Sequence, residues 1–438
     1  MTRLDHSSQS SRFLLIGFIL TCLYALSKIH TPDAFSNAIG APMVLLGFYS
    51  IYRYGKDLST RTPMLLLLAG IVIPVLSWYF AHLAHPEWTN KIPRLDKLAR
   101  VFLFIPIAWW LKDCSKKVFI FWSLAALTVI FSPWIGGGGW QEIISGSQGG
   151  RIDYDLRNAG HTSLFFGLIL IGLLCFLPRL YRWKKASLIV WLPITLFCTF
   201  TMIASQTRAA WLALIASALM FAFVVIFNKK LRQKLNIKRL TIGAMVVLGL
   251  AFAVYSTMGN TLKNRSASES SVIEKVISGN LQDIPYTSVG IRIHLWEAGL
   301  AKIAERPLLG WGNKGQRISI DQNDWMPENI KQNFGHLHNI YLSILNNYGL
   351  VGLTFYFTLF GWVMFKVLKA VSKKQLDKDI GYFVIVAFTF WSVVNLFESY
   401  LFFWTGVFSI QVLFGGLLAL IWQAEIKEKQ QQDNQTPQ

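Results

Sequence analysis

The sequence FGHLHNIYL at residues 334–342 sets two histidines and a carboxamide directly against an apolar run. Histidine is the side chain whose ordinary pKa lies closest to neutral pH, so His336 and His338 are the best candidates in the chain for proton transfer. Asn339 stands where a helix cap is expected, just before the apolar run. The stretch therefore predicts a catalytic site at a membrane surface.

The composition is that of an integral membrane protein. Of 438 residues, 53% are hydrophobic and 14% aromatic, which excludes an ordinary soluble surface. Lys+Arg number 42 against Asp+Glu 23, a net charge of +19, and they cluster in short gaps between apolar runs. This pattern indicates membrane topology and contact with anionic lipid, not binding of nucleic acid. The four cysteines imply neither a disulfide framework nor a thiolate metal site.

The apolar runs predict an all-α polytopic membrane protein with about twelve transmembrane helices. A run of about 20 apolar residues is needed to cross the hydrocarbon core. Runs of this kind are expected near residues 12–28, 37–53, 63–83, 97–111, 117–135, 162–180, 186–205, 208–227, 240–258, 349–371, 380–398 and 401–423.

These spans divide the chain into four predicted parts. Residues 1–258 hold the first nine helices, and residues 259–348 form a large, partly helical outer loop with the catalytic region. Residues 349–423 hold the last three helices, and residues 424–438 are a solvated tail.

The orientation of the chain follows from its basic gaps. Lysine and arginine fill the gaps after the second, fourth, sixth, eighth and tenth predicted spans, with residues 91–100 as a counter-example on the other side. Since such residues face the cytoplasm, both termini are predicted to be cytoplasmic and the loop to lie on the periplasmic or extracellular face.

Part of the outer loop is predicted to fold. Ile293, Trp296 and Leu300 recur at helical spacing, and Pro307 stops that helix. The charges of the loop are mixed in sign, unlike those of the basic gaps.

Two arginines on the predicted outer face are candidate anion ligands. Arg208 follows the turn that joins two apolar stretches, and Arg292 lies at the start of the outer-loop helix. Each has an ordinary explanation, a side chain reaching the interface for Arg208 and a surface ion pair for Arg292. The alternative is phosphate binding, which suits the permanently charged, planar guanidinium.

Arg157 and His161 are further candidates for ligand contact. They follow a glycine-rich run at residues 136–140 on the same predicted face. Glycine-rich backbone can approach a phosphate, but a flexible loop explains the run equally well.

The two histidines admit a metal site as an alternative to a general base. Histidines two residues apart can face one way in an extended chain. No carboxylate or thiolate stands at ligand spacing nearby in the sequence, which favours the general base.

Several short motifs, in this order along a chain of many spans, resemble the O-antigen ligase family of Gram-negative inner membranes. They are SQTRAAW at residues 205–211, GIRIHLW at 290–296, RPLLGWG at 306–312, HN at 338–339 and LNNYGLVG at 345–352.

The resemblance implies a GT-C-like, lipid-dependent glycosyltransferase of the inner membrane with its active site on the periplasmic face. Such ligases move O-antigen from undecaprenyl pyrophosphate to lipid A-core, with inversion and without a metal or nucleotide cofactor. His338 would be the base, Arg208 and Arg292 would hold the pyrophosphate, and His336 and Asn339 would orient the base.

Three alternatives remain open at this point. An O-antigen polymerase and a protein O-oligosaccharyltransferase use the same donor. A polyisoprenoid or sugar transporter would explain twelve spans, but it should show repeats and charged or broken segments near the midplane.

Overall fold

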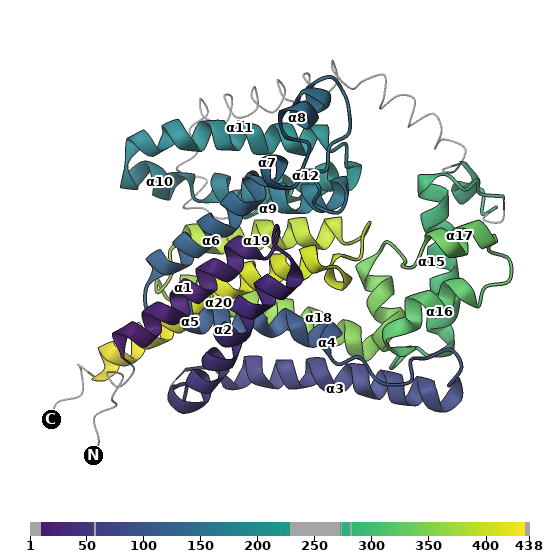
Figure 1. The fold of residues 1–438 in the computed structure, drawn as a ribbon, viewed down its shortest axis with the longest axis horizontal. Coiled ribbons are helices and arrows are strands. Elements are labelled where there is room, and N and C mark those ends of the chain that lie inside the picture. Colours follow the sequence, from purple (N-terminus) through teal and green to yellow (C-terminus); the bar gives the residue numbers. More distant parts are fainter. Residues whose placement is uncertain (1–9, 57, 228–271, 273, 281–282, 434–438) are drawn as a thin grey trace.

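The protein is described here by a computed structural model that covers residues 10–56, 58–227, 272, 274–280 and 283–433 (Figure 1). Within these residues every regular element is a helix. The predicted ninth span, at residues 240–258, lies outside the described residues.

Six of the described helices are long and apolar enough to cross a membrane. A seventh span results if α9 and α10, which are bent by 52° at their junction, count as one. The chain is therefore an all-α, multi-pass membrane protein, as predicted. The six helices are α2 (Asp33–Tyr54), α3 (Arg61–Ala84), α11 (Leu188–Ala204, with the short η2 before it), α12 (Arg208–Phe227), α18 (Ile340–Ser372) and α20 (Trp404–Asp433), and the bent pair is α9 (Ala159–Cys175) with α10 (Leu177–Trp183).

Three other predicted spans are shorter helices packed on this set. They are α1 (Ser11–Ser27), α6 (Ser115–Ile130) and α19 (Lys378–Val394).

The predicted fourth span, residues 97–111, differs from a simple membrane helix. It is broken into α4 (Asp96–Ala99), η1 (Arg100–Leu103) and α5 (Phe104–Leu111), and all eight residues of α5 are buried. A helix that is apolar on every side is stable when protein surrounds it. Here Ile107 of α5 packs against Gly415 of α20, so α5 forms part of the core.

Helix α20 is the centre of the bundle. In its most apolar stretch 89% of the residues are buried, and Trp122 of α6 donates a hydrogen bond to the Val412 carbonyl at 2.9 Å. The helix continues through Asp433, so the segment expected to be a solvated tail is helical up to that residue. Glu425 in this segment pairs with Lys366 of α18 at 3.3 Å, which ties the end of α20 to the bundle.

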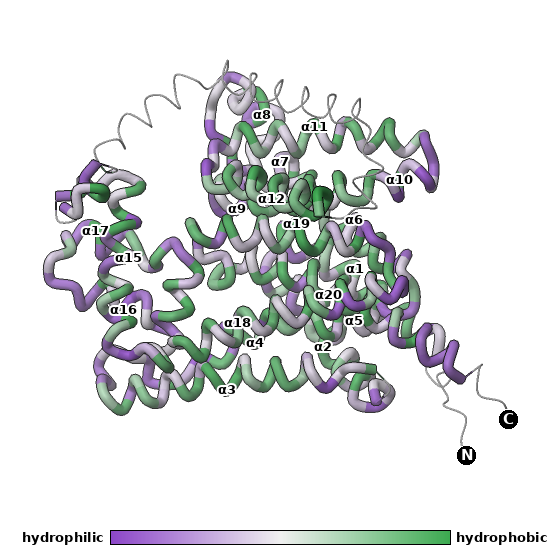
Figure 2. The backbone as a smooth tube through the Cα atoms, turned by 180° about the vertical axis from the view of Figure 1, so that it is seen from behind, coloured by the Kyte–Doolittle hydropathy of each residue, from purple (hydrophilic) through white to green (hydrophobic). Residues whose placement is uncertain are grey.

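The outer loop forms a separate helical cluster beside the bundle (Figures 1 and 2). It contains α15 (Ser288–Glu305), α16 (Gly315–Asp321) and α17 (Glu328–Asn333). The predicted helix that ends before Pro307 is α15, and Leu295 and Ala298 of this helix are buried against Ile320 and Leu337. The loop thus has a hydrophobic core of its own.

Helix α18 is broken at Gly349, and the break joins the outer cluster to the bundle. Gly349 has φ 61° and ψ −162°, a conformation that is essentially restricted to glycine. The backbone N–H groups of the next two residues, Leu350 and Val351, donate to the carbonyls of Pro307 and Leu308 at 2.8 and 3.1 Å. The tenth span was expected to begin at residue 349, and this is where the break lies.

We expect Gly349→Ala to destabilise the protein by about 1–3 kcal/mol. A Cβ at this position would lie 2.2 Å from the carbonyl carbon and oxygen of Leu308. The thermal unfolding temperature in detergent is the measurement. Gly361→Ala, in the same helix, is the matched control because a Cβ there meets nothing within 4 Å. Equal unfolding temperatures for the two variants would contradict the prediction.

Candidate active site

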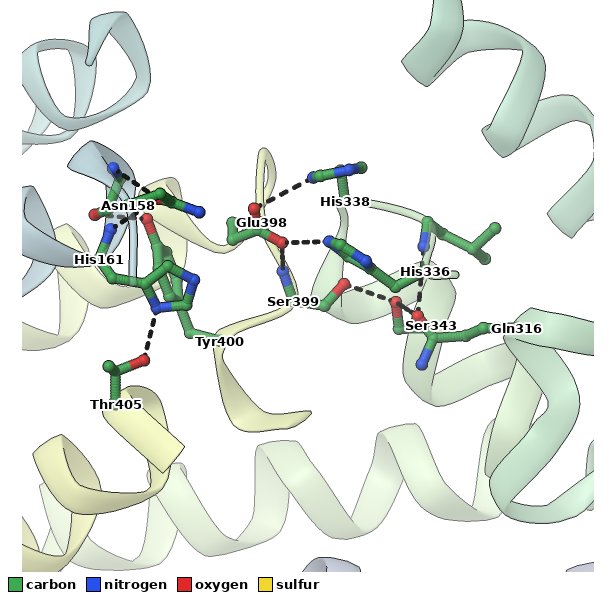
Figure 3. Close-up of polar contacts among 12 residues, drawn as sticks. Asn158, His161, Gln316, His336, His338, Ser343, Glu398, Ser399, Tyr400 and Thr405 are labelled. Carbon is green, nitrogen blue, oxygen red and sulfur yellow. Dashed lines mark hydrogen bonds and ion pairs between the residues drawn. The ribbon is translucent and has the colours of Figure 1, made fainter. Parts of the chain in front are cut away.

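One carboxylate binds both histidines of the predicted site. Glu398 accepts a hydrogen bond from Nε2 of His336 at 2.9 Å and another from Nδ1 of His338 at 3.0 Å (Figure 3). The two imidazole rings lie 3.9 Å apart between centroids. The side chains are only 23% (His336), 15% (His338) and 14% (Glu398) exposed, so the cluster is largely shielded from water.

The backbone around the histidines is held from several sides. Trp296 of α15 donates to the Leu337 carbonyl at 2.8 Å, and Gln316 of α16 accepts from the Leu337 N–H at 3.2 Å. His338 adopts a left-handed conformation, with φ 48°. Asn339 then caps α18 by accepting from the N–H groups of Tyr341 and Leu342. The backbone N–H and carbonyl of Leu337 are thus both hydrogen-bonded to the outer cluster. The imidazoles of the two flanking histidines point toward Glu398.

Glu398 is fixed by the loop between α19 and α20. The N–H of Ser399 donates to the Glu398 carboxylate at 2.8 Å. The Ser399 hydroxyl lies 2.7 Å from that of Ser343 on α18, which in turn donates to Gln316 at 2.6 Å. This network connects the carboxylate to the same Gln316 that holds Leu337 (Figure 3). The histidine segment and Glu398 are thus positioned by one set of hydrogen bonds.

The electrostatics of the cluster favour an ionised glutamate beside a neutral histidine. Burial opposes a charge on Glu398, but the hydrogen bonds that both histidines donate to it act the other way, and the pKa of this carboxyl lies well below its usual range. Burial lowers the pKa of His338, and Glu398 offsets only part of that effect. At neutral pH His338 is therefore able to accept a proton.

The shared carboxylate also determines which ring nitrogens are available. An ionised carboxylate only accepts hydrogen bonds, so Nδ1 of His338 and Nε2 of His336 carry the hydrogens. The lone pairs are left on Nε2 of His338 and Nδ1 of His336. This is the arrangement in which a carboxylate orients a histidine base in a catalytic triad.

A second wall of the site lies across from the histidines and comes from the start of α9. Figure 3 shows Asn158 and His161 on the other side of Glu398. His161 is 1% exposed and binds Thr405 through Nδ1, and among the described residues its buried Nε2 has no hydrogen-bond partner. A buried nitrogen without a partner is uncommon in a folded protein, so this atom is a candidate for ligand contact.

The aromatic ring of Phe403 connects the two walls. The ring centroids of His161 and His336 each lie 5.1 Å from that of Phe403. The guanidinium of Arg157 lies over the same ring, at 4.1 Å from its centroid. Arg157 and His161, which were minor candidates in the sequence, therefore lie beside the histidine pair.

The structure places Arg292 and Arg208 on different walls. The charge of Arg292, on α15, acts on His338 and contributes to the lowering of its pKa. Arg208 is the first residue of α12, after the tight turn at residues 205–207. Thr207 of that turn donates to the Ala159 carbonyl at 3.2 Å, which attaches the turn to the wall formed by α9.

The histidines and Glu398 could also hold a metal ion. One ligand atom from each residue lies within 4.8 Å of the others. The sequence argument against a metal relied on the lack of a carboxylate nearby, and that argument fails because Glu398 is supplied from 60 residues later in the chain. In the arrangement described, one nitrogen of each imidazole is at hydrogen-bond distance from the carboxylate.

Glu398 was missed by reasoning from sequence. It was assigned to the end of a predicted span at residues 380–398, whereas α19 ends at Val394. A signal was present, because Glu398 is the only charged residue between Asp379 and Glu425. An isolated charge among apolar residues of a membrane protein is a candidate for function.

Glu398→Gln is expected to lower the pKa of His338 further. The carboxylate raises this pKa against the effect of burial, and a neutral amide removes the charge. Modification of His338 by diethyl pyrocarbonate, quantified by mass spectrometry over a pH series, reports the fraction of neutral imidazole. His85, which lies at the far end of α3 and stacks on Trp88, is the internal control. An unchanged or raised pKa would contradict the pairing.

Comparisons with known proteins indicate what this chain is similar to. Residues 193–357 match the family model described as O-antigen ligase, and this stretch contains Arg208, Arg292 and both histidines. An uncharacterized protein from Haemophilus influenzae is 26% identical over 369 residues, which cover 82% of this chain and 86% of that protein. Residues 193–357 of this chain are therefore similar to the O-antigen ligase family.

Proposed function

We propose that this protein is an O-antigen ligase that completes lipopolysaccharide at the periplasmic face of the bacterial inner membrane. It transfers O-antigen polysaccharide from undecaprenyl pyrophosphate to a sugar hydroxyl of lipid A-core. The observation that carries the proposal is the pair of histidines on one buried carboxylate, beside arginines, in a chain of this family.

The reaction needs a base at the acceptor hydroxyl. Nε2 of His338 takes the hydroxyl proton, and the acceptor oxygen attacks the anomeric carbon of the donor sugar. The bond from that carbon to the pyrophosphate oxygen breaks as the new glycosidic bond forms on the opposite face, so the configuration inverts. Glu398 stabilises the imidazolium that results, and undecaprenyl pyrophosphate leaves with the electron pair.

Charge develops on the pyrophosphate as it leaves. Arg292, near His338, and Arg208, beside α9, are assigned to bind it, since a guanidinium can hold a phosphate by two parallel hydrogen bonds. Arg157 and the unpaired Nε2 of His161 are assigned to substrate binding on the same wall. His336 shares Glu398 with the base and orients it, and Asn339 fixes the start of α18.

A metal or nucleotide is not required by this chemistry. Pyrophosphate on an anomeric carbon is already a good leaving group, so a base, cations and exclusion of water suffice. The alternative metal site uses the same three side chains. A chelator distinguishes the general base from the metal site, because it would stop only the metal-dependent reaction.

Purified protein in nanodiscs, given carrier-linked O-antigen and lipid A-core, is expected to extend lipid A-core in the presence of EDTA. His338→Ala should reduce the rate by about 10²–10⁴-fold, the usual contribution of a general base. Arg208→Ala and Arg292→Ala should also lower the rate strongly, with partial recovery in the lysine variants, which keep the charge but not the planar fork.

His85→Ala is the control, because in the described part of the chain His85 contacts Glu87, Trp88 and Trp311 and neither Glu398 nor the site histidines, so it should leave transfer unchanged. Longer carrier-linked chains without extension of lipid A-core would make the protein a polymerase. Loss of activity in EDTA that divalent ions restore would favour the metal site. Glycan transferred to a protein, or substrate flux without transfer, would overturn the proposal.

The rate of transfer is expected to remain constant from neutral pH down to below about 6.5, the ordinary pKa of histidine. The base must be neutral, and burial lowers the pKa of His338, so activity is lost only as the pH falls through that lowered value. The dependence of kcat/KM on pH measures this acid limb for the free enzyme. An acid limb above 6.5 would contradict His338 as the base.

A further inference from the structure

A separate apolar groove lies in the bundle, away from the histidines. It opens between α6 and α9 and has a volume of about 240 Å³. Ser409 and Val412 of α20 form its floor, and Phe383 of α19 lines one side. Trp122 of α6 and Leu168 of α9 line its flanks. Because its surface is almost wholly apolar, the groove suits a hydrocarbon chain.

The length of the groove matches one leaflet of a bilayer. On α6 its lining runs from Phe119 to Val129. Ten residues of α-helix extend about 15 Å. The hydrocarbon core is about 30 Å thick, so the groove has the depth of one leaflet.

The groove ends on aromatic rings at the end nearest the active site. Phe165, one turn after His161 on α9, packs against Trp404 and Phe408 with ring centroids 6.1 and 6.3 Å apart. The chain that occupies the groove therefore enters from the lipid side or from the opposite end.

The opposite end is bordered by positive charge. Arg179 of α10 lines the groove and stacks over Phe119 at 4.8 Å. It is held there by Asp377 and Asp379 at 2.7 and 2.8 Å, so its own charge is neutralised. Directly beyond it the chain carries exposed basic residues in a hydrophilic turn (Figure 2). They are Arg182, Lys184 and Lys185.

We propose that this groove binds an anionic phospholipid, with one acyl chain between α6 and α9 and the phosphate against the basic turn at residues 182–185. The apolar lining supplies affinity for the chain, and the basic turn supplies preference for a negative head group. This site does not depend on the proposed transfer reaction, because none of its residues belongs to the active site.

The proposal is tested by lipid binding to the full-length protein. Purified protein is exchanged into detergent and titrated with phosphatidylglycerol or phosphatidylcholine of identical chains, and bound lipid is counted by native mass spectrometry. The wild type is expected to bind one phosphatidylglycerol tightly and phosphatidylcholine more weakly. Equal binding of the two lipids would overturn the assignment of the basic turn.

A variant that fills the groove provides a second test of lipid binding. Gly172 lines the groove, and a Cβ there meets only Phe383 at the ordinary contact distance of 3.7 Å, so Gly172→Leu should fold while occupying the space. It should weaken phosphatidylglycerol binding at least about tenfold, as expected when a few buried methylenes are lost. Gly361→Leu on α18 is the matched control and should bind like the wild type.

Two further variants keep the test decisive. Ala126→Phe fills the same groove from α6 and replaces Gly172→Leu if that variant unfolds. Lys184→Gln with Lys185→Gln should remove the preference for phosphatidylglycerol but leave binding of the acyl chain. Unchanged lipid binding in both filled variants would overturn the proposal. It would also be overturned if the filled variants bound phospholipid normally but bound less of the undecaprenyl donor than the wild type.

Discussion

The geometry of the candidate site depends on one carboxylate, largely shielded from water, that two imidazoles share. A carboxylate removed from water is stable only if donors and positive charges replace its hydration. Glu398 receives three hydrogen bonds, from His336, His338 and the N–H of Ser399. These bonds join the outer loop to the segment between the last two helices. The same contacts that stabilise the charge therefore hold His338 just before the start of α18.

The outer cluster is attached to the bundle by a second group of buried polar contacts. Asn346 of α18 accepts from Ser319 at 2.6 Å and donates to the Gly299 carbonyl at 2.8 Å. Asn347 accepts from the Gln316 N–H at 3.1 Å. Buried amides bonded in this way favour one arrangement, because a shift would break these hydrogen bonds. The break at Gly349 lies two residues after Asn347, and the part of α18 before it also buries Ile344 and Tyr348 in the core of the bundle, so this part joins the outer cluster to the bundle.

The candidate site and the groove would bind different ligands. The active site has paired histidines, arginines and an unpaired buried nitrogen, which suit a polar, charged substrate. The groove has an apolar lining and a basic border, which suit a structural phospholipid. Phe165 and its aromatic neighbours lie between the two, one turn below His161.

The sequence by itself determined the class of the protein, most of its described helices and the histidines of the site. These features follow from local properties: the length of apolar runs, helical periodicity in α15, the proline after it, and Asn339 as a cap. Only the tertiary structure decided that Glu398 binds the histidines, that α5 is buried, and that Arg157 lies on Phe403. Each of these depends on packing between segments far apart in the chain, which no local pattern of residues encodes.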